Sequence, residues 1–293
     1  MSKESLDKFI EYLRVERGLS ENTWASYRRQ ILSYLRFLND RGQDAVTVGR
    51  EAIIEYLRQR KDGGLKGSSL FIVTIAIRQF HRFLKERSLS ANDPTVGIRL
   101  PKFKQKLPDP LSAAEMEKLL RPTLSRKFSA VRNIALVELA YSTGLRATEL
   151  VTLKMNQINL TEGWARVVGK GDKERVVPVG NKAKEAVLAY IEVRKNRSPI
   201  ATDTLFLNSR GQPLTRGGFG RELKEMAKRK GIIGRVTPHQ LRHSFATRLL
   251  EGGTDIRVIQ EALGQSDIST TQRYTHVRPE LIRTNCEKSH PRF

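Results

Sequence analysis

A histidine and an arginine stand three residues apart in the segment Thr237-Pro238-His239-Gln240-Leu241-Arg242. Thr237 suits an N-cap and Pro238 the first helical position, so the spacing predicts a helix with His239 and Arg242 on one face of its first turns. Free backbone N–H groups and the positive end of the helix dipole favour an anion there. An imidazole can exchange a proton with a phosphate ester, and a guanidinium can hold two of its oxygens. Alone, His-x-x-Arg is a weak motif.

A second candidate anion ligand, Arg146, follows Gly144, which we expect to end a helix, and stands at the opening of the next one. Glu149 lies three residues further on and can reach back to fix the guanidinium; the alternative is an ordinary surface ion pair. Lys170 lies in Gly169-Lys170-Gly171-Asp172-Lys173, which has the composition of a hairpin turn. From such a turn its side chain can reach a cleft as a proton donor or stay exposed.

A candidate nucleophile, Tyr274, lies near the end of the sequence. We expect Gly264 to end one helix and Ser269 to cap a short one over residues 269–274. The tyrosine can be a core residue or a nucleophile. A phenol, with a pKa of about 10, loses its proton more easily than Ser or Thr when cations surround it.

The elements that must position these residues form two blocks. Residues 1–93 carry apolar side chains at helical spacing and predict a small four-helix bundle, with helices near 6–13, 24–38, 52–59 and 69–86. We expect Ser20 to cap the second helix. Basic side chains lie on the opposite helix faces: Arg14, Arg17, Arg28, Arg29, Arg58, Arg60, Lys61 and Lys66.

Between the blocks, residues 94–110 combine four prolines with alternating lysines, which predicts a stiff basic linker. Such a strap can cross a phosphate backbone or be merely exposed. The second block, 111–293, is mainly helical, with two β-prone runs at 164–168 and 175–179 around the predicted hairpin turn. Its helices are expected to begin at a Ser112/Glu115 capping box and to follow near 131–141, 147–153, 182–195, 219–230, 238–251, 256–263 and 269–274.

The composition points to a polyanionic partner. Among 293 residues, 53 Lys and Arg stand against 31 Asp and Glu, a formal net charge of +22. Nucleic acid is the first candidate. The longest apolar run, 70–77, is far shorter than the roughly 20 residues of a membrane span. The first residues carry acids and no secretory leader, so we expect a cytoplasmic protein. One cysteine excludes an intrachain disulfide, and no Cys/His cluster suggests zinc.

Taken together, four motifs resemble the tyrosine recombinases, the lambda-integrase family. They are Thr-Gly-Leu-Arg-x-x-Glu-Leu, Gly-Lys-Gly-x-Lys-x-Arg, His-x-Leu-Arg-His-Ser-Phe-Ala-Thr and Leu-Gly-x-Ser-x-Ile-Ser-Thr-Thr-x-x-Tyr-Thr-His, in matching order. The N-terminal block, the chain length and the closing His290-Pro291-Arg292 are similar to the Xer subfamily. The resemblance implies a SAM-like core-binding domain followed by a mainly α catalytic domain with a small β-hairpin or sheet.

The resemblance also implies a reaction. Tyr274 would attack a DNA phosphodiester, form a 3′-phosphotyrosyl bond and free a 5′-hydroxyl that attacks the partner strand. Arg146 and Arg242 match the two phosphate-binding arginines of the family, Lys170 its general acid and His239 the histidine that handles the nucleophile's proton. Fixed cations can carry such a reaction without a metal or cofactor, and no acidic metal cluster is evident.

One position departs from the family pattern. After Leu-Gly the family has histidine or, less often, tryptophan, and this chain has Gln265. An amide N–H can donate to a phosphate oxygen but cannot carry charge or pass a proton. Gln265 is the single feature that favours an alternative function, a catalytically silent DNA-binding clamp.

The resemblance implies partners as well. They are double-stranded DNA and three further protomers, of this chain or a related recombinase, around two DNA sites, with an activating protein in addition. Residues 279–293 would dock on a neighbouring protomer; a frayed tail is the alternative. The implied role is resolution of chromosome or plasmid dimers at segregation. A mobile-element or phage integrase is the nearer alternative, and a type IB topoisomerase the more distant one.

Overall fold

The computed structural model describes residues 2–102, 109–121, 127–169, 174–195, 197, 202–234, 236–264 and 279–293. Contacts divide the chain into an N-terminal unit, Met1–Leu107, and a C-terminal unit, Pro108–Phe293. Each unit has its own hydrophobic core. Among the described residues, no helix is long and apolar enough to cross a membrane.

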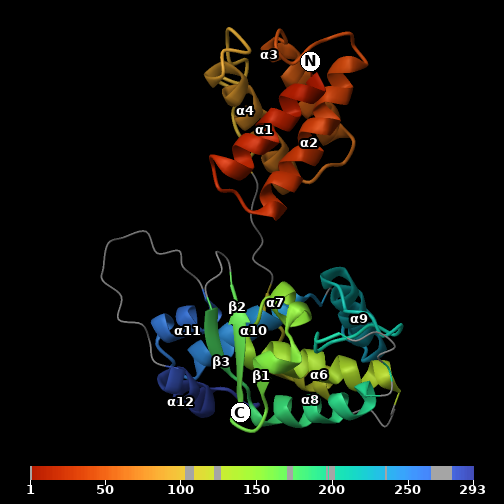
Figure 1. Cartoon of the computed structure of the whole chain (residues 1–293), viewed down its shortest axis with the longest axis vertical. Coiled ribbons are helices and arrows are strands. Elements are labelled where there is room, and N and C mark those ends of the chain that lie inside the picture. Colours follow the sequence, from red (N-terminus) through yellow and green to blue (C-terminus); the bar gives the residue numbers. More distant parts are fainter. Residues whose placement is uncertain are drawn as a thin grey trace. The chain divides into compact units, whose positions relative to one another are not determined.

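The N-terminal unit is a bundle of four helices, as the apolar spacing predicts (Figure 1). They are α1 (Ser2–Val15), α2 (Glu21–Asn39), α3 (Arg50–Asp62) and α4 (Gly67–Glu86). Fully buried aromatic side chains, Phe9, Tyr34 and Phe80, lie in its core. Ser20 occupies the N-cap position of α2 as predicted, but its side chain makes no capping hydrogen bond to the backbone.

Residues that follow α4 also pack on the N-terminal unit. Ile98 is buried in its core, and the Arg50 guanidinium donates to the Gly97 carbonyl at 3.1 Å. The Arg78 guanidinium donates to the carbonyl of Ile98. The first part of the segment 94–110 is thereby tied to the bundle. The alternating lysines of that segment lie partly in 103–108, outside the described residues.

The C-terminal unit places helices around a three-stranded antiparallel sheet of order β1-β2-β3. The strands are β1 (Ile158–Asn159), β2 (Trp164–Val168) and β3 (Glu174–Pro178). Arg175 of β3 lies opposite Val167, and Val176 lies opposite Arg166. Strand β3 was expected one residue later, at 175–179. Strand β1 was not expected, because two residues are too few to show an alternating pattern.

Helices of the C-terminal unit begin with α5 (Ala113–Leu120), whose predicted Ser112/Glu115 capping box is confirmed. The long α6 (Phe128–Thr143) packs along α8 (Asn181–Arg194), as Figure 1 shows. The others are α7 (Ala147–Thr152), a 3-10 turn (Met155–Gln157), α9 (Arg216–Arg229), α10 (Pro238–Glu251), α11 (Ile256–Leu263) and α12 (Pro279–Ser289). The mainly α fold with a small sheet is thus confirmed.

The last helix, α12, lies against β3, α10 and α11 of the same chain. Ile282 and Cys286 are buried in the core of the C-terminal unit, and His290 is buried beyond them. The Arg292 guanidinium pairs with the buried carboxylate of Glu138. In this structure, therefore, residues 280–293 are not a frayed tail.

Candidate active site

Arg242 is the most deeply buried of the described candidate residues, 8% exposed, in the first part of α10. Its Nη1 donates to the Gly144 carbonyl at 2.8 Å and its Nη2 to the Leu263 carbonyl at 2.7 Å. Both carbonyls lie at helix C-termini, where the backbone has no helical partner and the dipole favours a cation. Burial, and then the positive charges of Arg146 and Arg175, lower the pKa of Arg242 to about 10, so it stays charged at neutral pH.

The glycine that ends α6 permits this packing. Gly144 has φ of 62°, in the left-handed region, as its predicted C-cap role requires. A Cβ added there would lie 2.4 Å from the ring of Phe245. A larger residue would therefore push α10, which carries both Phe245 and Arg242, away from the end of α6.

Arg146 and Glu149 make the contact that their spacing predicts. The Arg146 Nη1 and backbone N–H donate to the two carboxylate oxygens of Glu149, each at 2.8 Å, and Nη2 donates to the Gly264 carbonyl at 2.9 Å. The Glu149 side chain is 6% exposed and that of Arg146 is 39% exposed. The pair is therefore not an ordinary surface ion pair, because its carboxylate is buried while part of its guanidinium faces solvent.

A third arginine, Arg175, completes the cluster. Its Nη1 and Nη2 donate to the two oxygens of Glu149 at 3.0 and 2.9 Å, and its Nε donates to the Ala262 carbonyl at 3.3 Å. Burial raises the pKa of Glu149, but the hydrogen bonds of Arg175 and Arg146 outweigh burial and lower it. The carboxylate is thus ionised among three cations.

These contacts converge on one helix end. Three successive carbonyls at the C-terminus of α11, those of residues 262, 263 and 264, accept hydrogen bonds from Arg175, Arg242 and Arg146 in turn. We name this set, with Glu149, the arginine cluster. It joins α7, α10, α11 and β3 at one place. It can hold an anion with several fixed positive charges.

Arg175 was not among the predicted site residues, although it closes the motif Gly-Lys-Gly-x-Lys-x-Arg. A signal was present, because Arg175, Val177 and Val179 share one face of the predicted strand. Val177 and Val179 are buried, so Arg175 had to be an inward-facing cation in need of an acid.

His239 is the second residue of α10, three before Arg242, and is exposed. The predicted N-terminus of that helix is confirmed, because Thr237 and Gln240 form a capping box. Lys170, Gln265 and Tyr274, and the short helix expected over 269–274, lie outside the described residues. The structure therefore brings Arg146 and Arg242 together and leaves these three positions as predictions.

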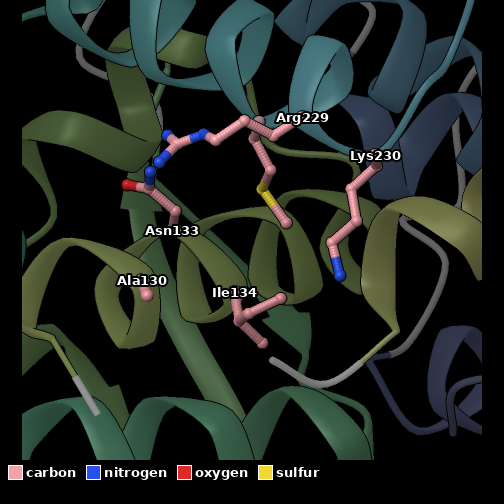
Figure 2. Close-up of a pocket in the computed structure, with 6 residues that line it drawn as sticks. Ala130, Asn133, Ile134, Arg229 and Lys230 are labelled. Carbon is pink, nitrogen blue, oxygen red and sulfur yellow. The ribbon is translucent and has the colours of Figure 1, made fainter. Parts of the chain in front are cut away.

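A cavity of about 300 Å³ lies elsewhere in the C-terminal unit, between α6 and the end of α9 (Figure 2). Its lining residues are Ala130, Asn133, Ile134, Met226, Arg229 and Lys230. No member of the arginine cluster lines this cavity. Within the described part of the chain, no three His, Cys, Asp or Glu side chains are grouped as metal ligands.

Comparison with known families defines the class of this protein. Residues 110–280 match the model described as the phage integrase family, and residues 6–88 match the phage integrase N-terminal SAM-like domain. The chain belongs to the phage integrase family and is a site-specific recombinase of the tyrosine type.

Individual relatives cover the whole chain. Tyrosine recombinase XerD of Oceanobacillus iheyensis is 42% identical over 300 residues, with 100% of both chains covered. Tyrosine recombinase XerD of Staphylococcus haemolyticus is 40% identical over 290 residues, with 98% of both covered. The chain is thus most like the Xer recombinases, as its motifs predict.

Solved structures agree on the fold. The crystal structure of XerA recombinase is 30% identical, covers 100% of both chains and has a TM-score of 0.52. A lambda integrase dimer bound to a COC′ core site has a TM-score of 0.72 at 20% identity, covering 94% of this chain and 99% of that one.

Proposed function

We propose that this recombinase cuts and rejoins duplex DNA through a 3′-phosphotyrosyl intermediate, with the arginine cluster as its phosphate site. The single observation that carries the proposal is the hydrogen bonding of the two candidate ligands. Arg146 and Arg242 each donate hydrogen bonds from two guanidinium N–H groups to other residues of the protein. Of the five that a guanidinium has, the rest have no partner among the described residues. A scissile phosphate between them would accept hydrogen bonds from both arginines.

The proposed reaction begins when the Tyr274 hydroxyl oxygen attacks the phosphorus. The P–O5′ bond breaks, the phosphotyrosyl bond forms, and His239 accepts the proton of the tyrosine. Lys170 gives its own proton to the leaving 5′ oxygen, so that a 5′-hydroxyl is released. Arg146, Arg242 and an N–H of Gln265 stabilise the charge on the non-bridging oxygens. The reverse sequence, with a 5′-hydroxyl of the other duplex, joins the exchanged strands.

The charge of the N-terminal unit supports duplex DNA as the substrate. Eight basic residues on its helices and the adjoining turns make no ion pair with any described residue, and all but Arg60, which is half-buried, are exposed. They are Arg14, Arg17, Arg28, Arg29, Arg58, Arg60, Lys61 and Lys66. In this proposal residues 1–93 and 111–293 contact one duplex, joined by the basic linker 94–110.

Assembly and biological role belong to the same proposal. Solved relatives include a lambda integrase tetramer bound to a Holliday junction and XerH bound to a difH substrate. We propose four protomers, of this chain or with a related recombinase, around two sites, activated by a further protein. Residues 279–293, which pack on β3, α10 and α11 of their own chain in this structure, would dock on a neighbouring protomer there. Full-length similarity to proteins named XerD favours cytoplasmic resolution of chromosome or plasmid dimers at segregation over an integrase role.

Covalent trapping tests the proposed chemistry. Duplexes that bind the Tyr274→Phe protein are first selected from a random library, and the selected site is then made with a nick beside the cleaved bond. Wild-type protein incubated with this duplex and EDTA should give a slow band on a denaturing gel, absent with Tyr274→Phe. Binding without a band would instead indicate either a missing partner or the silent clamp, and Gln265→His is then the next variant to test. With the selected site in a plasmid, recombined products identify a recombinase and relaxation alone a topoisomerase.

A further inference from the structure

Arg175 differs from the other two arginines of the cluster in what its guanidinium contacts. Its side chain is 12% exposed, against 39% for Arg146. It presents a two-point fork to Glu149 and a third hydrogen bond to the Ala262 carbonyl. Because Arg175 is paired with a buried carboxylate in this way, its positive charge is largely neutralised within the protein.

Glu149 joins Arg175 to Arg146. Its Oε1 accepts from Nη1 of both arginines, and its Oε2 accepts from Nη2 of Arg175 and from the backbone N–H of Arg146. All four bonds are between 2.8 and 3.0 Å long. Without the fork of Arg175, Glu149 would keep a single guanidinium partner and could rotate. The orientation of Arg146 would then no longer be fixed.

The same guanidinium packs on the end of α11. A Cβ added to Gly264 would lie 3.0 Å from two guanidinium atoms of Arg175, and Gly264 also provides the carbonyl that holds Arg146. Both anchors of the Arg146 guanidinium, Glu149 and Gly264, are therefore in contact with Arg175. The strand itself does not depend on these contacts, because five residue pairs join β3 to β2.

We propose that Arg175 is a positioning residue for Arg146. It holds Glu149 and Gly264 in the places from which they aim the Arg146 guanidinium at the scissile phosphate. The inference rests on the proposed function, because it takes Arg146 as a phosphate ligand. It assigns no contact between Arg175 and DNA.

A neutral substrate separates positioning from a structural role. A methylphosphonate linkage has a methyl group in place of one non-bridging oxygen and carries no negative charge, so an arginine that neutralises that charge matters less. The measured quantity is the cleavage rate on the phosphate duplex divided by the rate on the methylphosphonate duplex. This ratio does not depend on the fraction of protein that is folded.

Arg175→Lys keeps the charge and removes the fork. We expect it to lower phosphate cleavage by about 10- to 100-fold, the size of effect that a misplaced catalytic group produces. Methylphosphonate cleavage should change by less than about threefold, so the ratio falls. Glu149→Gln should do the same, and the double variant should be no worse than the more impaired single variant, because both act through Arg146.

Two controls make the outcome decisive. Arg166→Lys changes a neighbouring arginine on β2 that stacks on Trp164, 5.9 Å from the ring centroid, and should leave the ratio unchanged. Arg146→Lys should lower the ratio most. Suppose that Arg146→Lys lowers the rate ratio but Arg175→Lys does not, either because it slows cleavage of both substrates equally or because it slows neither. The positioning role of Arg175 is then wrong, while the proposed function stands. If Arg146→Lys leaves the ratio unchanged, Arg146 is not a phosphate ligand, and both ideas fail.

Discussion

Two buried arginines of the C-terminal unit, Arg132 in α6 and Arg242 in α10, use their guanidinium groups differently. Arg132 has no exposed surface. Its three nitrogens donate to the Asn133 side chain and the Leu207 carbonyl, and its Nη2 also pairs with Glu222 at 2.8 Å. Arg242 is nearly as buried but has two carbonyls and no carboxylate as direct partners among the described residues.

The difference separates a structural cation from a candidate ligand. Removing a guanidinium from water is costly, and for Arg132 four contacts inside the protein, one of them to a counter-charge, offset that cost. Arg242 is held in place by two contacts and retains donors for an anion from outside. Burial alone therefore does not mark a site, whereas a buried cation with incomplete hydrogen bonding does.

The largest effect that tests this comparison is expected for Arg242→Lys. A lysine keeps the charge but replaces the planar fork by one ammonium group, which cannot hold two carbonyls and a phosphate together. Single-turnover cleavage of the selected nicked duplex should fall by about 10²- to 10³-fold, as when one preorganised donor of an oxyanion site is lost. Cleavage within tenfold of wild type would contradict the ligand role of Arg242.

Arg132→Met should show the opposite balance. The variant leaves Asn133 and Glu222 without their buried partner; the Glu222 side chain is 32% exposed and can regain water. We therefore expect a loss of about 2 kcal/mol in the free energy of unfolding, below the usual cost of breaking a buried pair. That corresponds to a fall of about 4–8 °C in Tm, measured by calorimetry.

Below its unfolding transition, Arg132→Met should cleave the nicked duplex at a rate within about threefold of wild type, because Arg132 lies outside the arginine cluster. A matched control is Arg197→Met, which removes an arginine stacked on the ring of Phe128, 5.6 Å from its centroid. It should leave both Tm and cleavage nearly unchanged. A large loss of cleavage by folded Arg132→Met protein would remove the distinction between the two arginines.

The placement of Arg242 could be predicted from the sequence, whereas that of Arg132 could not. Arg242 lies in a motif whose local spacing, Thr237 cap and His239 included, suffices to place it at a helix N-terminus. The partners of Arg132 include Leu207 and Glu222, which are 75 and 90 positions away, and no periodicity connects them. For Arg175, strand alternation indicates an inward-facing side chain but not its partners, since it meets Glu149 across 26 residues and Ala262 across 87.

Local sequence signals predicted the helices and their caps better than they predicted the tertiary contacts between elements. The capping box at Ser112, the αL glycines 144 and 264, and helices 238–251 and 256–263 are all confirmed, because each depends on residues within one turn. The helical stripe of Ile282 and Cys286 in α12 was not recognised, so residues 279–293 were expected either to dock on a neighbouring protomer or to be a frayed tail. Their cis packing depends on tertiary contacts with β3, α10 and α11.

His290 sharpens the comparison, because it too is buried with a hydrogen-bonding group unused. It is 4% exposed, its Nε2 has no partner among the described residues, and its ring packs against Tyr141 and Phe245 at centroid distances of 4.5 and 5.6 Å. Burial, and then the charges of Arg292 and Arg248, lower the pKa of His290 to about 3. It is therefore neutral at pH 7 and, unlike Arg242, offers no charge to an anion.

The consequence is a smaller, pH-dependent effect. The folded-state pKa of His290 lies below its unfolded value of about 6.5, so its contribution to stability is complete above pH 6.5 and is lost as the pH falls towards 3. Between pH 7 and pH 5.5 the loss from this histidine is about 1 kcal/mol. His81, buried in the N-terminal unit with its pKa lowered by burial to about 4, acts in the same direction there.

Between pH 7 and pH 5.5, the free energy of unfolding of the His290→Phe protein should therefore fall by about 1 kcal/mol less than that of wild type. Because the two units can unfold separately, urea unfolding is followed by Trp164 fluorescence in a Trp24→Phe background, which reports on the C-terminal unit alone. Cleavage at pH 7 should stay within about twofold of wild type, since no phosphate ligand is removed. Equal acid losses in both proteins would show that His290 is not held neutral. Lost cleavage at pH 7 would mean that a buried group can serve the site without a charge, and the rule drawn from Arg132 and Arg242 would fail.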